Sequence, residues 1–248
     1  MGASWARDLA DLLLPAGCIA CGIWVRGGEQ APSVCERCRT RLKVAPWPRC
    51  ERCHFPRGTG SASDLECRGC RDWSAALSAA RYAYVLAPPV DDLVHALKYE
   101  AWPELAPVMA AAMSALSLPG EVGRVFVTPV PTTAERLRTR GYNQAGKLAE
   151  CFAAGRSLPV VDLLSRRGAG SSQTSLHPSE RRSNVAGAFS MGADVRVGLE
   201  GARVLLIDDV LTTGATACEA ANTLVAAGVA RVTLVAFARA LPGLRTAA

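Results

Sequence analysis

The spacing of hydrophobic and polar positions changes near residue 75. Beyond it, apolar runs of strand length alternate with segments whose apolar residues recur at helical spacing. The runs that predict strands are 81–86, 124–130, 158–164, 203–210 and 231–239. The segments that predict helices are 91–99, 104–116, 143–156 and 216–227. Strands that alternate with helices indicate βαβ units, so we expect residues 75–248 to form an α/β domain, with a parallel sheet flanked by helices on both faces.

Residues 1–74 lack this alternation and are marked instead by cysteine. Eight of the ten cysteines lie there as four C-x2-C pairs, and the spacing C-x2-C-x13-C-x2-C occurs twice in tandem. The eight are Cys18, Cys21, Cys35, Cys38, Cys50, Cys53, Cys67 and Cys70. The segments 26–33 and 54–64 between them are polar and rich in Gly and Pro, so they offer little to a hydrophobic core. We therefore expect residues 1–74 to be a separate small domain that a metal holds together.

The paired cysteines predict two structural zinc ribbons. Two thiolates two residues apart can lie on one tight turn, and two such turns supply the four ligands of a tetrahedral Zn2+, with no open position for catalysis. The repeat favours sites made from consecutive pairs, but a cross-braced arrangement stays open because spacing does not fix connectivity. A disulfide framework needs an oxidising compartment, and the amino end does not resemble an export signal. His54, beside Cys53, either replaces a thiolate or lies exposed in its loop.

The strand predicted at 203–210 leads directly into two carboxylates and a loop of small residues. Ligands bind at the carboxyl ends of the strands in such folds, so Asp208 and Asp209 should reach the ligand edge of the sheet. The loop residues are Thr212, Thr213, Gly214, Ala215 and Thr216. Their backbone N–H groups and hydroxyls, at the start of a helix, suit a dianionic phosphate, whereas the carboxylates suit ribose hydroxyls, directly or through Mg2+. The chain contains neither a Walker A loop nor a G-x-G-x-x-G fingerprint.

A basic stretch follows the strand predicted at 124–130. Arg136, Arg138 and Arg140 precede a helix expected to begin near Asn143, and we expect them to lie in a loop. Arginines near the amino end of a helix suit pyrophosphate, and Arg136 and Arg140 are the strongest candidates for that contact. A solvated basic turn would have the same composition.

Three other features are weaker candidates for the same site. Lys98 either contacts the ligand or extends along an apolar surface toward water. Arg239 ends the last strong strand at the ligand edge. Segment 166–189 is long, polar and poor in structure signals, which indicates a functional lid or a disordered loop. Within it, Arg166 fits ordinary surface charge.

The sequence VLLIDDVLTTGAT at 204–216 resembles the phosphoribosyl diphosphate (PRPP) motif of type I phosphoribosyltransferases. The chain as a whole resembles the ComF family of competence and DNA-uptake proteins: two zinc ribbons, HALKY, VTPVPTTAERLRTRGYNQAGKLA, ERRSNVAGAF and the PRPP motif follow in that order. The resemblance implies a type I phosphoribosyltransferase-like fold. It also implies that Asp208 and Asp209 hold the ribose hydroxyls, that 212–216 hold the 5-phosphate, and that 166–189 form a lid. The lid positions that match the family pattern are Gln173, Arg181 and Asn184.

Two functions fit these features. As an enzyme, the chain would be a glycosyltransferase of DNA uptake, transformation or nucleotide salvage, which replaces the pyrophosphate of PRPP with a nitrogen acceptor and uses Zn2+ and Mg2+. Alternatively, it would be a non-catalytic single-stranded DNA-binding or adaptor protein that uses the phosphoribosyl site for nucleotide binding. Stacking platforms are few, since Trp24, Trp47 and Trp73 are the only tryptophans near the cysteines and such residues usually pack a small domain. Turnover, the acceptor and the oligomeric state stay open.

Charge and hydropathy add little to this choice. The formal net charge is +6, and only three of the 28 basic residues are lysines. Arginine suits bidentate contacts with phosphate, but so modest a balance also fits a simple solubility role. The apolar runs are shorter than the roughly 18 residues that span a bilayer, so we expect a cytoplasmic protein without membrane insertion, whose partners include DNA-uptake proteins.

Overall fold

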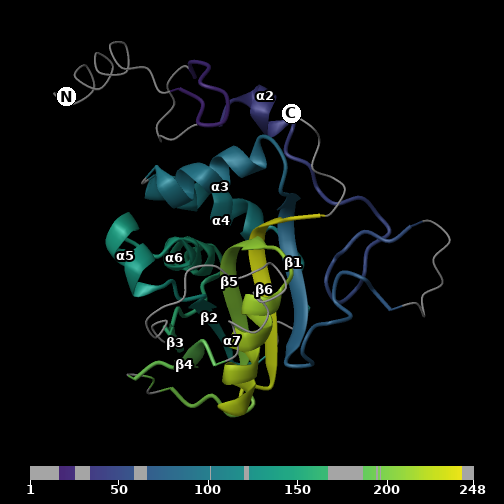
Figure 1. Ribbon diagram of the computed structural model, residues 1–248, viewed down its shortest axis with the longest axis vertical. Helices are drawn as coiled ribbons and strands as arrows, with labels where there is room; N and C mark the ends of the chain where they lie inside the picture. Colours follow the sequence, from purple (N-terminus) through teal and green to yellow (C-terminus); the bar gives the residue numbers. More distant parts are fainter. Residues whose placement is uncertain are drawn as a thin grey trace, which may run out of the picture.

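The computed structural model describes residues 17–25, 34–58, 66–100, 102–119, 123–166, 187–193, 195 and 197–241. Its centre is a four-stranded parallel sheet with the strand order β1-β6-β5-β2 (Figure 1). The strands are β1 (Leu77–Val85), β2 (Val125–Pro129), β5 (Arg203–Leu211) and β6 (Arg231–Arg239). Four of the five predicted strands are thereby confirmed, and the predicted parallel α/β sheet is confirmed with them.

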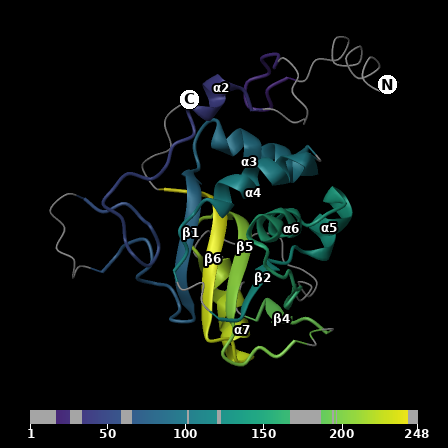
Figure 2. The same cartoon turned by 180° about the vertical axis from the view of Figure 1, so that it is seen from behind.

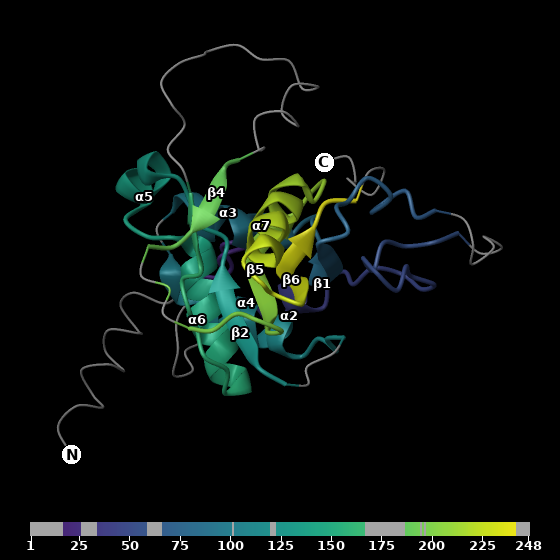
Figure 3. The same ribbon diagram turned by 90° about the horizontal axis from the view of Figure 1, so that it is seen from below.

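Helices cover both faces of this sheet. The helix α7 (Ala215–Ala226) lies on one face, whereas α4 (Ala106–Ser114) and α6 (Gln144–Arg156) lie on the other (Figure 3). The side chains of β5 alternate between the two: Val204 and Leu206 join the hydrophobic core that contains α7, and Leu205 and Ile207 join the core that contains α4 and α6. The second core also includes α3 (Val90–Tyr99), and a 3-10 turn, η1 (Pro103–Leu105), precedes α4. In the described part of the chain, no helix has the length and apolar character needed to cross a membrane.

The strand predicted at 158–164 is wrong as a member of the sheet. Only Val160 forms a bridge to β2, opposite Val127. The N–H of Leu163 then donates to the carbonyl of Val161 at 2.9 Å, so the backbone turns away from the sheet edge. It continues into β3 (Leu164–Arg166), which pairs antiparallel with β4 (Phe189–Met191), a strand that the sequence pattern did not predict.

The cysteine-rich segment covers the outer edge of β1 (Figures 1 and 2). The N–H of Val85 donates to the carbonyl of Lys43 at 2.7 Å, and the N–H of Ala80 donates to that of Arg52 at 2.8 Å. An edge strand presents unpaired N–H and C=O groups, and these contacts occupy two of them. The one short helix of this segment among the described residues is α2 (Glu36–Arg39). Division of the chain into domains 1–74 and 75–248 stays a prediction.

Candidate metal centres and anion-binding site

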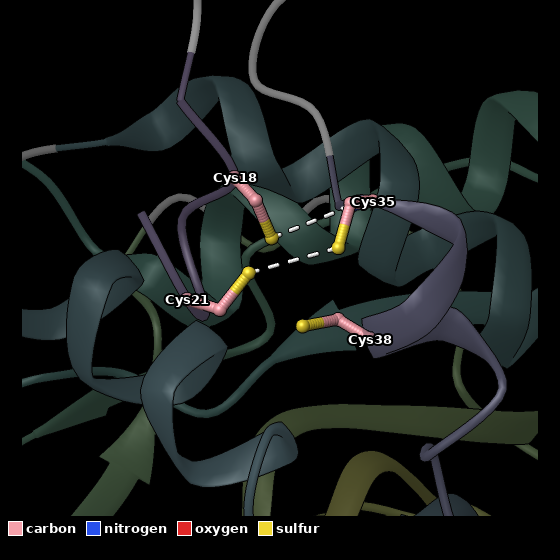
Figure 4. Close-up of side chains that lie close together, drawn as sticks. All are labelled: Cys18, Cys21, Cys35 and Cys38. Atoms are coloured by element: carbon pink, nitrogen blue, oxygen red, sulfur yellow. Dashed lines mark hydrogen bonds between the residues drawn. The ribbon is translucent and has the colours of Figure 1, made fainter. Parts of the chain in front are cut away.

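The first two C-x2-C pairs form one cluster, which we call ribbon 1 (Figure 4). The sulfurs of Cys18, Cys21, Cys35 and Cys38 all lie within 4.8 Å of one another. The Sγ atoms of Cys21 and Cys35 are 3.7 Å apart. Four thiolates at about 2.3 Å from a tetrahedral Zn2+ are about 3.8 Å apart, so the cluster has the dimensions of a structural zinc site.

The last two pairs form a second cluster of the same size, which we call ribbon 2. The Sγ–Sγ distances are 3.9 Å between Cys50 and Cys70, and 3.7 Å between Cys53 and Cys67. The structure therefore brings consecutive pairs together, as the repeat favoured, and does not form the cross-braced arrangement. The ligand cluster does not include His54, which is half-buried and accepts a hydrogen bond from the Tyr82 hydroxyl at its backbone carbonyl.

Backbone N–H groups prepare one thiol of each ribbon for ionisation. Burial opposes ionisation of Cys18, but backbone donors, among them the N–H of Cys35 at 3.3 Å, lower its pKa to about 6. Burial also opposes ionisation of Cys50, and backbone donors lower its pKa to about 7. Burial and neighbouring cysteines raise the pKa of Cys38 and Cys70, so these thiols lose their protons when a cation binds.

The acidic pair lies near the carboxyl end of β5, as predicted. Asp209 is 3% exposed, and its Oδ2 lies 3.1 Å from the Nζ of Lys98 at the end of α3. The Oδ1 of Asp208 accepts a hydrogen bond from the backbone N–H of Asp209 at 2.9 Å. Burial, and then the charge of Asp209, raise the pKa of Asp208. A cation or a set of hydroxyl donors that contacts the pair would favour its doubly ionised form.

Residues 212–216, which were predicted to hold a phosphate and are here called the phosphate loop, follow β5 and include the first two residues of α7. Gly214 has φ +86°, a conformation that favours glycine, and its carbonyl accepts the N–H of Cys218 at 2.8 Å to begin the helix. The hydroxyl of Thr213 accepts the N–H of Ala215 at 3.3 Å. The remaining first-turn N–H groups of α7 have no partner within the helix, so the loop can receive an anion.

The loop predicted for Arg136, Arg138 and Arg140 is wrong, because these residues form a short helix, α5 (Ala134–Arg140). The hydroxyl of Thr133 caps the helix by accepting the N–H of Arg136 at 3.2 Å, and Gly141 ends it with φ +79°. No residue of this helix is buried, so it has no buried apolar face for a periodicity argument to detect. The sequence signals that could have predicted this helix are Thr133 as its N-cap and Gly141 as its C-terminal glycine.

A basic cavity of about 420 Å³ opens between α5 and the end of α3. It brings together Lys98, Arg136 and Arg140, which were predicted to bind the same ligand. The full lining is Lys98, Tyr99, Glu135, Arg136, Thr139, Arg140 and Tyr142. The guanidinium of Arg140 is 4.9 Å from the centre of the Tyr99 ring and donates to the Gln144 side chain at 3.0 Å, so its position is fixed from two sides.

Arg166, which the sequence assigned to ordinary surface charge, lies within electrostatic range of the acidic pair. Its guanidinium lies 5.3 Å from the centre of the Phe189 ring. Burial and the charge of Arg136 lower the pKa of Arg166, and the charge of Asp208 opposes that shift. Both charged groups therefore influence the Arg166 guanidinium. Arg166 belongs to β3, whose antiparallel partner β4 was not predicted. No local sequence signal indicated that Arg166 would lie near the acidic pair. Residues 167–186 of the expected lid, with Gln173, Arg181 and Asn184, lie outside the described residues.

A second cavity, of about 670 Å³, is lined by residues of both ribbon 2 and the phosphate loop. Its walls include Phe55, Trp73 and Leu241, together with the two threonines at the start of the loop. Arg239, predicted as a weak ligand contact, faces the ribbon instead: it is 2% exposed and donates to the carbonyls of Gly69, at 2.9 Å, and of Cys53. The carboxyl edge of the sheet thus has a basic cavity on one side of the acidic pair and a largely apolar cavity beside the phosphate loop.

Comparisons with protein families agree with this architecture. Residues 9–71 match the family described as the double zinc ribbon domain, and residues 137–244 match the phosphoribosyl transferase domain. The first match contains all eight clustered cysteines, and the second contains the acidic pair and the phosphate loop. The type I phosphoribosyltransferase-like fold with a preceding double zinc ribbon, expected from the resemblance, is confirmed.

The curated relatives carry names from DNA utilization and competence. The DNA utilization protein YhgH of Escherichia coli K12 is 27% identical over an alignment of 238 positions, gaps included, which covers 85% of this chain and 98% of that protein. The competence protein ComFC of Bacillus subtilis is 28% identical over an alignment of 206 positions, gaps included, which covers 79% of each chain. The competence protein F of Haemophilus influenzae is 33% identical over 115 residues, 46% of this chain and 50% of that one. The chain is therefore a homologue of these DNA utilization and competence proteins, with a double zinc ribbon domain and a phosphoribosyltransferase domain.

Proposed function

We propose that the chain binds PRPP with Mg2+ and transfers its phosphoribosyl group to a nitrogen acceptor. The observation that carries the proposal is the arrangement at the carboxyl ends of the strands: an acidic pair, an anion-binding helix terminus and a basic cavity lie side by side. Asp208 and Asp209 would hold the ribose hydroxyls, and the backbone N–H groups of residues 212–216 would hold the 5-phosphate. Lys98, Arg136 and Arg140 line the basic cavity and would hold the pyrophosphate.

The acidic pair also fits a magnesium ion. The Oδ2 of Asp209 is buried and accepts no hydrogen bond among the described residues, although Lys98 lies 3.1 Å away. Two neighbouring carboxylates are the hard oxygen donors that Mg2+ prefers. When bound, the ion would neutralise the pair and part of the ligand's negative charge.

The reaction needs no nucleophilic side chain. The bond from C1 of the ribose to the pyrophosphate oxygen breaks, a bond from C1 to the acceptor nitrogen forms, and pyrophosphate leaves with its electron pair. Positive charge develops at C1 in the transition state, so the protein's task is to hold the leaving group and exclude water. The apolar cavity of about 670 Å³ has the size and the aromatic wall for a heterocyclic acceptor.

A binding or adaptor role is the second candidate. Trp24 and Trp47 are 68% and 72% exposed, against the expectation that tryptophans of this segment pack inside it, whereas Trp73 is buried. The guanidinium of Arg49 lies 4.7 Å from the centre of the Trp47 ring. Exposed aromatic rings beside arginine suit the stacking of single-stranded nucleic acid. In either role we place the protein in the cytoplasm, where thiols stay available to zinc, and link it to DNA uptake.

Isothermal titration of PRPP with Mg2+ into the zinc-loaded protein tests the proposal. We expect saturable binding by the wild type and by an Asp91→Asn/Asp92→Asn variant, which alters a second acidic pair at the start of α3. The Asp208→Asn/Asp209→Asn variant should not bind. Pyrophosphate release with a panel of bases then tests turnover. A folded wild type that does not bind PRPP would refute the transferase, and the salt dependence of single-stranded DNA binding would test the adaptor role.

A further inference from the structure

We propose that Trp73 is a positioning residue through which ribbon 2 holds the phosphate loop in its anion-binding conformation. The indole Nε1–H donates to the backbone carbonyl of Thr213 at 2.8 Å, across 140 positions of sequence. Trp73 is 8% exposed and follows the last cysteine of ribbon 2 by three residues. The inference rests on the proposed function, because it assigns the loop to a phosphate.

The bond fixes the direction of a backbone N–H group in the loop. The peptide unit that joins Thr213 to Gly214 is planar, and in a trans peptide the C=O and the N–H point in opposite directions. Because Trp73 binds the Thr213 carbonyl, the Gly214 N–H points away from ribbon 2. Successive N–H groups that point the same way form the concave site that receives an anion. Without the indole donor, this peptide unit would be free to rotate.

The indole also packs directly against the loop. A Cβ atom placed on Gly214 would lie 2.5 Å from Nε1 of Trp73 and 2.6 Å from its Cε2, closer than nonbonded atoms approach. Glycine at this position therefore serves the positive φ and the contact with the ring at once. The contact holds the two segments together even where the hydrogen bond alone would not.

Trp73 is in turn attached to the metal site. Its backbone N–H donates to the carbonyl of Cys70 at 3.1 Å, so the turn that carries two of the four thiolates also orients the tryptophan. Arg239, at the end of β6, donates to Gly69 in the same turn, and its guanidinium lies 5.6 Å from the centre of the indole ring. Ser74 adds a contact with Asn222 of α7 at 2.5 Å.

These contacts make zinc in ribbon 2 and phosphate in the loop energetically coupled ligands. Zinc fixes the turn, the turn fixes the indole, and the indole fixes the peptide unit that presents the Gly214 N–H. Coupling of this kind is reciprocal, so PRPP should strengthen zinc retention in ribbon 2 by the same factor by which zinc strengthens PRPP binding. Ribbon 1 packs with α3 and α4 instead and supplies the internal control.

The test compares Trp73→Phe, which keeps a ring but removes the N–H donor, with Trp47→Phe, which alters an exposed tryptophan of the same segment. Titration of PRPP with Mg2+ should show about fivefold weaker binding for Trp73→Phe, the size expected for one lost hydrogen bond, at unchanged zinc content. Trp47→Phe should bind like the wild type. Equal PRPP affinity of Trp73→Phe and wild type would overturn the inference.

Hydrogen exchange separates this inference from the proposed function, because it needs no PRPP. Backbone amides of residues 212–218 should exchange faster in Trp73→Phe than in the wild type, and Trp47→Phe should leave them unchanged. A wild type that shows this protection but binds no PRPP would refute the transferase while supporting the role of Trp73. Unchanged exchange in Trp73→Phe would refute that role.

Zinc release from the wild type tests the coupling without any variant, should Trp73→Phe fail to fold. In equilibrium competition with a chromogenic chelator the two zinc ions should be removed in separable phases, and saturating PRPP should raise the chelator concentration that removes the ribbon 2 ion about fivefold while leaving the phase of ribbon 1 unchanged. A PRPP-binding protein whose two phases respond equally, or not at all, would contradict the coupling.

Discussion

Ribbon 1 and ribbon 2 repeat one cysteine spacing but have different surroundings in the folded chain. Cys18 and Cys38 of ribbon 1 belong to the hydrophobic core on the α4 and α6 face of the sheet, and Cys21 is exposed. Ribbon 2 belongs to the core on the α7 face, with Cys50, Cys53 and Cys70 all buried, and it borders the phosphate loop. A metal-binding motif therefore does not by itself define its role, which depends on what the metal-ordered backbone contacts.

The attachment of ribbon 2 to the sheet explains why its role differs. The guanidinium of Arg52 donates to the carbonyl of Ser74 at 2.7 Å and to that of Leu77, the first residue of β1, at 2.9 Å. Arg239 binds the ribbon from the far end of β6. Both arginines donate to backbone carbonyls in or next to ribbon 2, so ribbon 2 and the strand ends form one packed unit.

Loss of a cysteine ligand should show the largest difference in effect between the two ribbons. We expect Cys70→Ser to reduce the zinc content from two ions to one, to weaken PRPP binding by at least about fivefold and to lower the free energy of unfolding by about 5 kcal/mol or more. Cys21→Ser should lose the other ion but keep PRPP affinity within about threefold, since ribbon 1 lies away from the loop. Zinc analysis, titration and denaturant unfolding measure the three quantities. Equal loss of PRPP binding in both variants would remove the distinction.

Removal of the Arg239 guanidinium should have the next largest effect. Arg239→Met keeps the apolar part of the side chain but leaves the carbonyls of Cys53 and Gly69 without this donor. We expect the free energy of unfolding to fall by about 3 kcal/mol. Arg37→Ala, on exposed α2, should change it by less than about 0.5 kcal/mol. Urea unfolding of both variants measures the difference, and similar values would contradict a structural role for the buried arginine.

The pH dependence of PRPP binding should arise from β5 and not from ribbon 2. Burial lowers the pKa of His54, the histidine of ribbon 2, to about 4, so that ring stays neutral above mildly acidic pH. The pKa of Asp208 is raised, so its ionised, ligand-binding form increases as the pH rises through that pKa.

We therefore expect PRPP with Mg2+ to bind more tightly in mildly alkaline than in mildly acidic solution. The unliganded protein should show the opposite trend in stability: a raised carboxyl pKa stabilises the folded state at low pH, and this contribution is lost as the pH rises through it. Titration and thermal unfolding across pH measure both trends. A His54→Gln variant should retain them, whereas Asp208→Asn should not; the reverse result would assign the dependence to the ribbon.

The smallest effect should come from the exposed tryptophan of ribbon 1. Trp24→Ser should leave PRPP affinity unchanged and alter the free energy of unfolding by less than about 0.5 kcal/mol. Single-stranded DNA binding is the informative measurement, because one lost stacking platform weakens it by about 1–3 kcal/mol. A weakened DNA complex with intact PRPP binding would assign nucleic acid to ribbon 1, and unchanged DNA binding would exclude Trp24 from that role.

The spacing of cysteines and apolar residues along the sequence predicted much of this protein's fold and the location of its candidate sites. The cysteine spacing favoured sites made from consecutive pairs, because a C-x2-C turn is local and the repeat is regular, but only the folded structure excluded the cross-braced arrangement. The period of apolar residues identified four sheet strands and four helices, because both faces of the sheet must be covered. The motif around Asp208 and Asp209 identified the ligand edge, because strand, carboxylates and loop are contiguous in sequence.

Contacts between distant segments were decided only by the tertiary structure. The exposed helix α5 and the short pair β3–β4 have little or no buried periodic face, so no pattern marked them. Nothing near Arg166 indicated that it would approach Arg136 and Asp208. The 140 positions between Trp73 and Thr213 carry no signal that they meet. The two ribbons have the same cysteine spacing, but they pack against different hydrophobic cores, and among the described residues only ribbon 2 contacts the phosphate loop. The sequence does not predict this difference, because the folded chain determines which apolar surfaces of the sheet each ribbon can cover.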